Sequence, residues 1–357
     1  MKNRIFMGVL ILGLIPCLFG WGADAKTITD LSGRQVVIPD KVERIVSPFT
    51  MYTRIIAALG GADKLVGISH TCLLPEEERP FGKDLLALPD VGDFGENIEL
   101  IASLKPDLIF ALPQSIRAFE EKTGATVVGA SFPEGGSMLE MFSRQIEVIG
   151  ESLHKEKEAN ALNAFIKEKL KSITDITSQI PEAQKPRVYF AWTSWTGDIT
   201  NTVVDFDPIE LAGGINVAGE AQNFAKGQRG ILVSREHILK WNPDVIFLSR
   251  YESNQWEKSK ANGKKAPVTI EEVLSDPLLQ GIRAVKNRRV YYTTAFCNWW
   301  PHQRAVAQTF QMAKIFYPER FKDLDVQKEG NEVFKRFYGG DGLYARLVEK
   351  LELYTGD

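Results

Sequence analysis

A long amphipathic helix is the feature that most constrains this sequence, and we expect it between about His154 and Gln179. Apolar residues recur in it at intervals of three or four, which places them along one stripe of an α-helix. These residues are Ala159, Leu162, Ile166, Leu170, Ile173 and Ile176. About 25 residues at 1.5 Å each give a rod of about 37 Å, longer than an ordinary connection between elements. The pattern therefore predicts a rigid spacer.

A similar segment stands on each side of this spacer. Before it, the segment IELIASLKPDLIFA places Pro106-Asp107 seven positions after Glu99. After it, the segment EHILKWNPDVIFLS places Pro243-Asp244 seven positions after Glu236. Both segments predict a helix, a Pro-Asp pair and then an apolar strand. We interpret the chain as two similar lobes joined by the spacer.

Strands alternate with helices in both parts, and parallel strands need such helical crossovers. We therefore predict an α/β fold of two Rossmann-like lobes with mainly parallel sheets, joined by one long backbone helix. The chain of 357 residues is long enough for two domains. The predicted divisions are an N-terminal lobe over residues 26–136, linking helices over 137–180 and a C-terminal lobe over 181–357.

The first 25 residues have the pattern of a signal peptide. Lys2 and Arg4 precede an apolar run from Ile5 to Leu18, and Ala23-Asp24-Ala25 matches a small-x-small cleavage site. The run is short for a bilayer span, which takes about 20 residues. We expect cleavage before Lys26 and a mature protein in the periplasm.

Cys17 raises the alternative of a lipoprotein, because it follows Leu14-Ile15-Pro16. Pro16 stands where a small residue would be wanted, so we expect no lipid anchor.

Composition and motifs exclude several classes of function. The net charge is −3 and positive residues are not clustered, so a nucleic-acid partner is not expected. The sequence has no GxSxG elbow, no phosphate-binding glycine loop and no HExxH. We expect a non-catalytic monomer, with an enzyme on the same scaffold as the less favoured alternative.

Ligands of open α/β sheets bind in loops at the carboxyl ends of strands. These loops contain aromatic residues with arginines nearby, a set that suits a planar or catecholate-bearing anion. For any single tryptophan, packing in the core is the simpler interpretation. The ligand-binding candidates are Tyr52, Arg54, His70, Trp192, Trp195, Arg250, Tyr251, Trp299, Trp300, His302 and Arg304.

Histidine and cysteine follow two of these strands, as His70 with Cys72 and as Cys297 with His302. Imidazole and thiolate together suit zinc, nickel or cobalt, so the four residues are candidate metal ligands. A Cys72–Cys297 disulfide is an alternative in an oxidising compartment, although it would tie the lobes together. The third interpretation is that all four are ordinary, partly buried residues.

Several of these features together resemble one transport family. They are the secretory start, the opening KTITDLSGRQVVIPDKVERIVS, the paired KPDLI and NPDVI segments and the intervening helix. The chain resembles the periplasmic substrate-binding proteins of ABC importers for ferric siderophores, haem and cobalamin, from Lys26 to about Tyr338. The resemblance implies a ligand held between two lobes, no covalent cofactor, and an inner-membrane permease with its ATPase as partners.

Glu99 and Glu236 have two interpretations. Each lies two residues after a capping candidate, Asn97 or Ser234, where an acid complements the positive end of a helix. The family resemblance implies a second role, in which one glutamate on each lobe pairs with arginines of the permease. The matched spacing favours docking.

The expected cargo is an iron chelate of the siderophore type. The alternatives are another metal ligand, namely cobalamin, haem, a free transition metal or an oxyanion such as molybdate. For a free metal or an oxyanion, the His/Cys set and the arginines would suffice without the aromatic residues.

Overall fold

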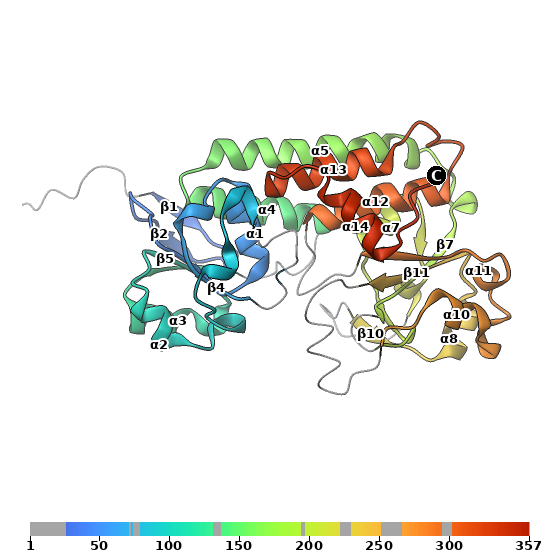
Figure 1. Ribbon diagram of the computed structural model, residues 1–357, viewed down its shortest axis with the longest axis horizontal. Coiled ribbons are helices and arrows are strands. Elements are labelled where there is room, and N and C mark those ends of the chain that lie inside the picture. The colour runs from blue at the N-terminus through green and yellow to red at the C-terminus, as the bar shows by residue number, and fades with distance from the viewer. Residues whose placement is uncertain are drawn as a thin grey trace, which may run out of the picture.

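The structure is a computed structural model that describes residues 26–70, 73, 79–130, 137–193, 197–221, 230–250, 266–294 and 302–356. Two separate sheets lie at the two ends of an elongated molecule, and long helices run between them (Figure 1). The predicted signal peptide and the end of the predicted N-terminal lobe at Gly135-Gly136 lie outside the described residues.

The first sheet is parallel throughout, with the strand order β4-β3-β5-β6. An antiparallel pair of strands, β1 with β2, precedes this sheet in the chain. The elements of this half are β1 Thr27–Thr29, β2 Gln35–Val37, β3 Ile45–Ser47, α1 Thr50–Ala58, β4 Leu65–Ile68, α2 Ile98–Ser103, β5 Leu108–Ala111, α3 Ile116–Thr123 and β6 Thr126–Gly129.

The second sheet is mixed, with the order β10-β8-β7-β11-β12 and β9 paired to β7. Its parallel strands follow the order β9-β7-β11-β12, which is the order of the first sheet, while β8 and β10 are antiparallel additions. The elements are β7 Arg187–Ala191, β8 Asn201–Val203, α7 Asp207–Leu211, β9 Ile215–Asn216, β10 Gly230–Leu232, α8 Arg235–Trp241, β11 Val245–Arg250, α10 Ile270–Ser275, α11 Arg283–Lys286 and β12 Val290–Thr294. The expectation of mainly parallel sheets is confirmed.

The two Pro-Asp pairs have the same structural role in both halves. Asp107 Oδ2 accepts a hydrogen bond of 2.8 Å from the backbone N–H of Arg44, just before β3. Asp244 Oδ2 accepts one of 2.9 Å from the backbone N–H of Arg187, at the start of β7. Each arginine in turn donates to a carbonyl at the end of the preceding helix, α2 or α8. The repeated sequence therefore joins a helix end to the first strand of each sheet.

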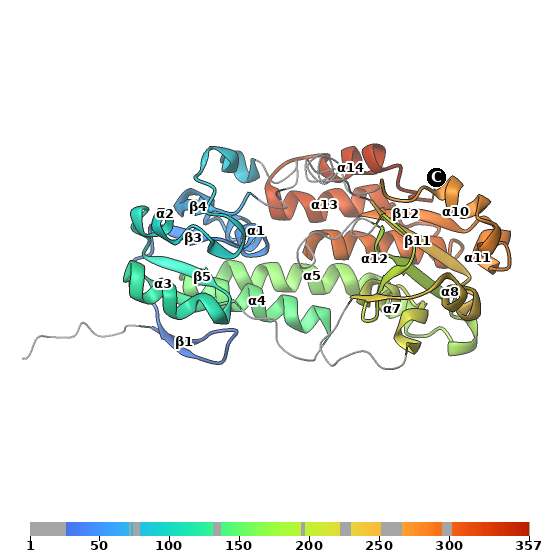
Figure 2. The same ribbon diagram turned by 90° about the horizontal axis from the view of Figure 1, so that it is seen from below.

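The spacer is one unbroken helix, α5 Glu156–Thr177, of 22 residues. At 1.5 Å per residue it is about 33 Å long. The predicted stripe is buried from Ala159 to Ile173, whereas Ile176 is only partly buried. A separate helix, α4 Met138–Ser152, precedes it and packs against it (Figure 2). A Cβ atom on Gly150 would lie 2.4 Å from the Ala159 Cβ, so glycine permits this close crossing.

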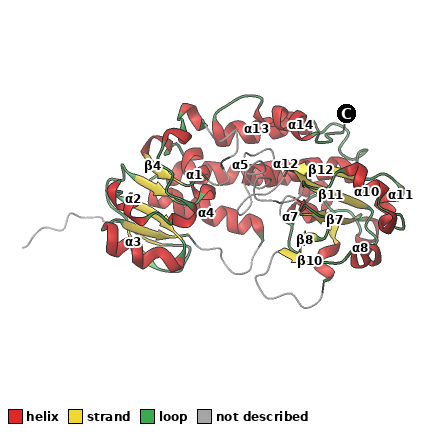
Figure 3. Cartoon of the chain, turned by 60° about the horizontal axis from the view of Figure 1, so that its bottom comes forward, coloured by secondary structure: helices red, strands yellow, loops and turns green. Residues whose placement is uncertain are grey.

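Three further helices complete the layer around α5, and Figure 3 shows them between the two sheets. They are α12 His302–Phe316, α13 Val326–Tyr338 and α14 Leu343–Leu351. The helix α13 packs against α12 and α14 and also contacts α1 of the first half. Lys169 Nζ on α5 lies 2.7 Å from Glu329 Oε2 on α13. The two halves are therefore bridged by α13 as well as by α5.

Candidate functional site

The two predicted docking glutamates lie in the first turns of α2 and α8. Asn97 caps α2 by accepting a hydrogen bond of 3.1 Å from the Leu100 N–H, and Ser234 caps α8 by accepting one of 3.3 Å from the His237 N–H. Both helices lie on the lower side of the molecule in Figure 1, one in each half. The matched spacing in the sequence thus corresponds to matched positions in the fold.

Both glutamate side chains face solvent. Glu99 is 78% exposed, and its carboxylate lies 3.2 Å from Lys122 Nζ. Glu236 is exposed, and hydrogen bonds from the Ser234 side chain and from its own backbone N–H hold its pKa below the usual value. Glu236 therefore remains negative across the neutral and mildly acidic range.

Arg54 and His302 come together although they lie far apart in the sequence. Arg54 is on α1, which follows β3, and is 2% exposed, while His302 begins α12 and is fully buried. Burial, together with the positive charge of Arg54, lowers the pKa of His302 to about 3. The imidazole is therefore neutral, beside a guanidinium group from the other half of the chain.

Gln145 on α4 adds a third buried polar group. The His302 ring lies 3.8 Å from the Phe142 ring, measured between centroids, and Gln145 follows Phe142 by one helical turn. Gln145 is fully buried. We call Arg54, Gln145 and His302 the junction cluster. Sequence reasoning missed Gln145, although a polar residue within the apolar stripe of an amphipathic helix was a usable signal.

A cavity of about 10 Å³, which has room for about one water molecule, lies beside Arg54. Tyr338 at the end of α13 closes it from the second half of the chain, and the Gln303 side chain on α12 donates a hydrogen bond to the Tyr338 hydroxyl. The lining residues are Thr50, Thr53, Arg54, Ala57, Leu73, Leu85 and Tyr338.

Two other ligand candidates are buried. Tyr52 is stacked on Phe110 with ring centroids 5.8 Å apart, inside the core of the first half. Arg304 is 1% exposed and shares the first turn of α12 with His302. Its charge acts on Tyr344 of α14, where it opposes the rise in the tyrosine pKa that burial causes.

The remaining described candidates lie apart from the junction cluster. His70 is partly exposed, with Nδ1 4.0 Å from Asp90 Oδ2. Arg250 lies 2.7 Å from the Glu352 carboxylate and 4.1 Å from the centre of the Tyr292 ring, which ties it to the C-terminal end of the chain. The Trp192 ring packs against Gly230.

Six candidates lie outside the described residues. They are Cys72, Trp195, Tyr251, Cys297, Trp299 and Trp300. Within the part of the chain that the structure describes, no group of three or more His, Cys, Asp or Glu side chains is arranged to hold a metal ion. The metal-site and disulfide hypotheses both depend on the cysteines and remain predictions.

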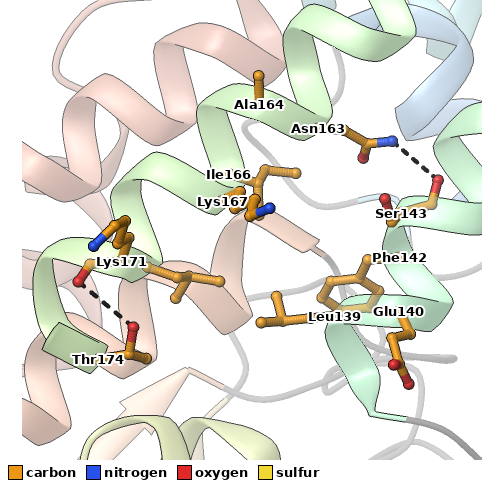
Figure 4. A pocket seen from close by; sticks show the side chains of 11 residues that line it. Leu139, Glu140, Phe142, Ser143, Asn163, Ala164, Ile166, Lys167, Lys171 and Thr174 are labelled. Atoms are coloured by element: carbon orange, nitrogen blue, oxygen red, sulfur yellow. Dashed lines mark hydrogen bonds between the residues drawn. The ribbon is translucent and has the colours of Figure 1, made fainter. Parts of the chain in front are cut away.

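A larger groove, of about 480 Å³, runs between α4 and α5. Figure 4 shows Leu139 and Phe142 of α4 and Ile166 of α5 facing the same space, with Lys167 and Lys171 farther along α5. Phe142 therefore separates this groove from the His302 ring. Glu140 also lines the groove, and its carboxylate accepts a hydrogen bond of 2.9 Å from the Ser137 N–H.

Comparison with known proteins identifies the family to which this chain belongs. Residues 45–295 match the family model described as periplasmic binding protein. The chain belongs to the periplasmic binding protein family. This member is 30% identical over 302 residues to the uncharacterized ABC transporter substrate-binding lipoprotein YvrC of Bacillus subtilis, covering 83% of this chain and 87% of YvrC.

Two further relatives of this family member carry ligand names. The molybdate-binding protein MolA of Haemophilus influenzae is 27% identical, over 91% of this chain and 95% of MolA. The Fe(3+)-citrate-binding protein YfmC of Bacillus subtilis is 23% identical, over 88% of this chain and 96% of YfmC. The solved structure of MolA with molybdate has a TM-score of 0.68 at 24% identity and covers 88% of this chain and 98% of that one, which confirms the two-lobed fold.

The class of function follows from the family. The chain is a substrate-binding component of an ABC transporter, which works with a permease and an ATPase. Its relatives are binding proteins, so the expectation that it is not an enzyme is confirmed. Among the described residues, no helix combines the length and the apolar character that a membrane crossing requires.

Proposed function

We propose that this binding protein captures an oxygen-rich anion between its two halves and that Arg54 meets the charge of that anion. The observation that carries the proposal is the burial of Arg54, at 2% exposure, where the two halves of the chain meet. In the low-dielectric interior of a protein, the charge of a guanidinium group acts strongly on a nearby anion. A guanidinium also matches planar or tetrahedral oxyanions through paired hydrogen bonds.

An iron chelate with carboxylate groups is the first candidate cargo. It agrees with the iron compound named for YfmC and with the sequence-based expectation of an iron chelate. Tyr52 is stacked on Phe110 in the core, so it does not offer a wall for a large planar ligand. A compact chelate therefore suits the described residues better than a large catecholate.

An oxyanion of the molybdate type is the second candidate. A single guanidinium group suits a small tetrahedral oxyanion through paired hydrogen bonds. The name of MolA, whose alignment covers 91% of this chain, gives the same ligand class.

Calorimetry with Arg54→Gln tests the proposal. Wild-type protein is titrated separately with molybdate and with ferric citrate, and the variant with whichever of them binds. We expect the variant to bind at least tenfold more weakly, because a charge-assisted hydrogen bond is lost. Arg117→Gln is the matched control, since Arg117 is 88% exposed. Equal affinity in wild type and Arg54→Gln would contradict the assignment.

We also propose the location and the route of delivery. Residues 1–25 act as a cleaved signal peptide, Cys17 carries no lipid, and the mature monomer works in the periplasm, in the lobes 26–136 and 181–357 joined by 137–180. Glu99 and Glu236 dock the loaded protein on the permease. Their exposure in the matched helices α2 and α8 supports this role.

A further inference from the structure

The junction cluster contains two buried side chains whose hydrogen-bonding capacity is unused. Both ring nitrogens of His302 and both amide atoms of Gln145 are buried without a hydrogen-bond partner among the described residues. Each side chain is fully buried. Buried polar atoms are nearly always hydrogen-bonded in native proteins, so such a pair needs an explanation.

Two other buried glutamines of this protein have hydrogen-bond partners at their side chains. On α12 itself, Gln308 Nε2 donates a hydrogen bond of 2.7 Å to the Thr294 carbonyl. Gln311 Nε2 donates one of 2.9 Å to the Tyr292 carbonyl, and Gln311 Oε1 accepts one of 2.9 Å from the Thr293 hydroxyl. Within the described part of the chain, the fold thus pairs these two buried amides of α12, and in Gln303 of the same helix only the carbonyl oxygen is unpaired, whereas Gln145 and His302 each leave both polar atoms unpaired.

The two side chains belong to different helices, α4 and α12. Phe142 places its ring 3.8 Å from that of His302, and Gln145 lies one turn further along the same face of α4. The charge of Arg54 acts on His302 from α1. An amide and a neutral imidazole each provide one or more donors together with an acceptor, so the pair can bind oxygen atoms of either kind.

We propose that Gln145 and His302 form a polar floor that binds oxygen atoms of the captured anion, while Arg54 meets its charge. This inference rests on the proposed function, because it names further contacts of the same ligand. The polar atoms are left unpaired in the ligand-free protein and are satisfied on binding. The unpaired atoms lower the stability of the ligand-free protein. Their hydrogen bonds to the bound anion raise its affinity and selectivity.

The test is Gln145→Met, with His302→Phe as a second variant, each measured in two ways. In ligand-free protein, we expect the thermal midpoint to rise, because an apolar side chain of similar volume removes unpaired polar atoms. In calorimetry with molybdate and with ferric citrate, we expect the affinity for the anion that binds to fall about tenfold or more.

Gln308→Met is the matched control, since it replaces a buried glutamine that is already hydrogen-bonded. We expect its midpoint to fall while its affinity stays at the wild-type value. A fall in the midpoint of Gln145→Met as large as that of the control would overturn the inference, as would unchanged affinity in both junction variants. Arg54→Gln separates the two proposals. If it alone loses binding, the proposed function stands and the polar floor is wrong. If only the junction variants lose binding, Gln145 and His302 hold the anion and the role given to Arg54 is wrong.

Discussion

His302 is a buried base whose protonation opposes folding. Its pKa is about 3 in the folded protein, against an ordinary value near 6.5 in the unfolded chain. Between these values the unfolded state binds more protons, so the free energy of unfolding decreases as the pH falls below about 6.5. The stability of the fold is therefore coupled to acidity through this residue.

We expect His302→Phe to remove part of the acid sensitivity. By linkage, lowering the pH from 7.5 to 5 costs wild-type protein about 2 kcal/mol through His302 alone. Urea unfolding of both proteins at the two pH values measures this difference. A variant whose stability falls as steeply as that of wild type would show that the imidazole is not held neutral.

Candidate site residues could be predicted from the sequence where they directly follow a strand. Arg54 and His302 follow strands of the two sheets, so the rule for carboxyl ends selected both. Gln145 lies on a helix that this rule does not cover, and its meaning appears only when α4 meets α12. Arg250 is the last residue of a strand, and it pairs with Glu352 near the C-terminal end of the chain. That contact depends on the tertiary structure, and the sequence around Arg250 does not indicate it.

The position of α4 on the spacer helix α5 depends on the close crossing of the two helices. Gly150 and Ala159 bring the two helices close together, since an added Cβ on Gly150 would lie only 2.4 Å from the Ala159 Cβ. Toward the N-terminus of α4, the same two helices are farther apart, and the groove lined by Phe142 lies between them. A bulkier residue at position 150 must therefore push α4 away from α5.

We expect Gly150→Ala to lower the free energy of unfolding by about 1–3 kcal/mol, the usual cost of overpacking, despite the better helix propensity of alanine. Denaturant unfolding measures the change. The combined variant Gly150→Ala with Ala159→Gly restores the space and should recover part of the loss. A stabilised Gly150→Ala protein would contradict the close crossing.

At the scale of elements, the long helix and the parallel strands were predictable because their periodicity is local. The strands β8 and β10 were missed, since three residues carry too little pattern and their pairing is set by the sheet. The packing of α13 against α1 was missed for a related reason. An amphipathic helix shows that one face is buried but not which half of the molecule buries it.

At the scale of the whole molecule, the helices α2 and α8, which carry Glu99 and Glu236, lie on the same side, one in each half (Figure 1). The proposed pairing with a permease predicts that Glu99→Ala combined with Glu236→Ala reduces uptake by at least tenfold while ligand affinity stays unchanged, because exposed charges act on orientation and encounter. Transport into proteoliposomes and calorimetry measure the two quantities.

Glu121→Ala combined with Glu182→Ala is the control for that prediction, since these exposed glutamates lie outside α2 and α8. We expect it to leave uptake unchanged. A large loss of affinity in the Glu99 and Glu236 double variant would show that the two residues act on the ligand rather than on docking.

The bridging helices also have a mechanical consequence. In Figure 1, α5 and α13 cross the upper side of the molecule, while α2 and α8 lie at its lower side. A force that separates α2 from α8 would therefore act about an axis that runs across the upper helices. Because two helices join the halves there, we expect such a force to widen the gap between the halves only slightly.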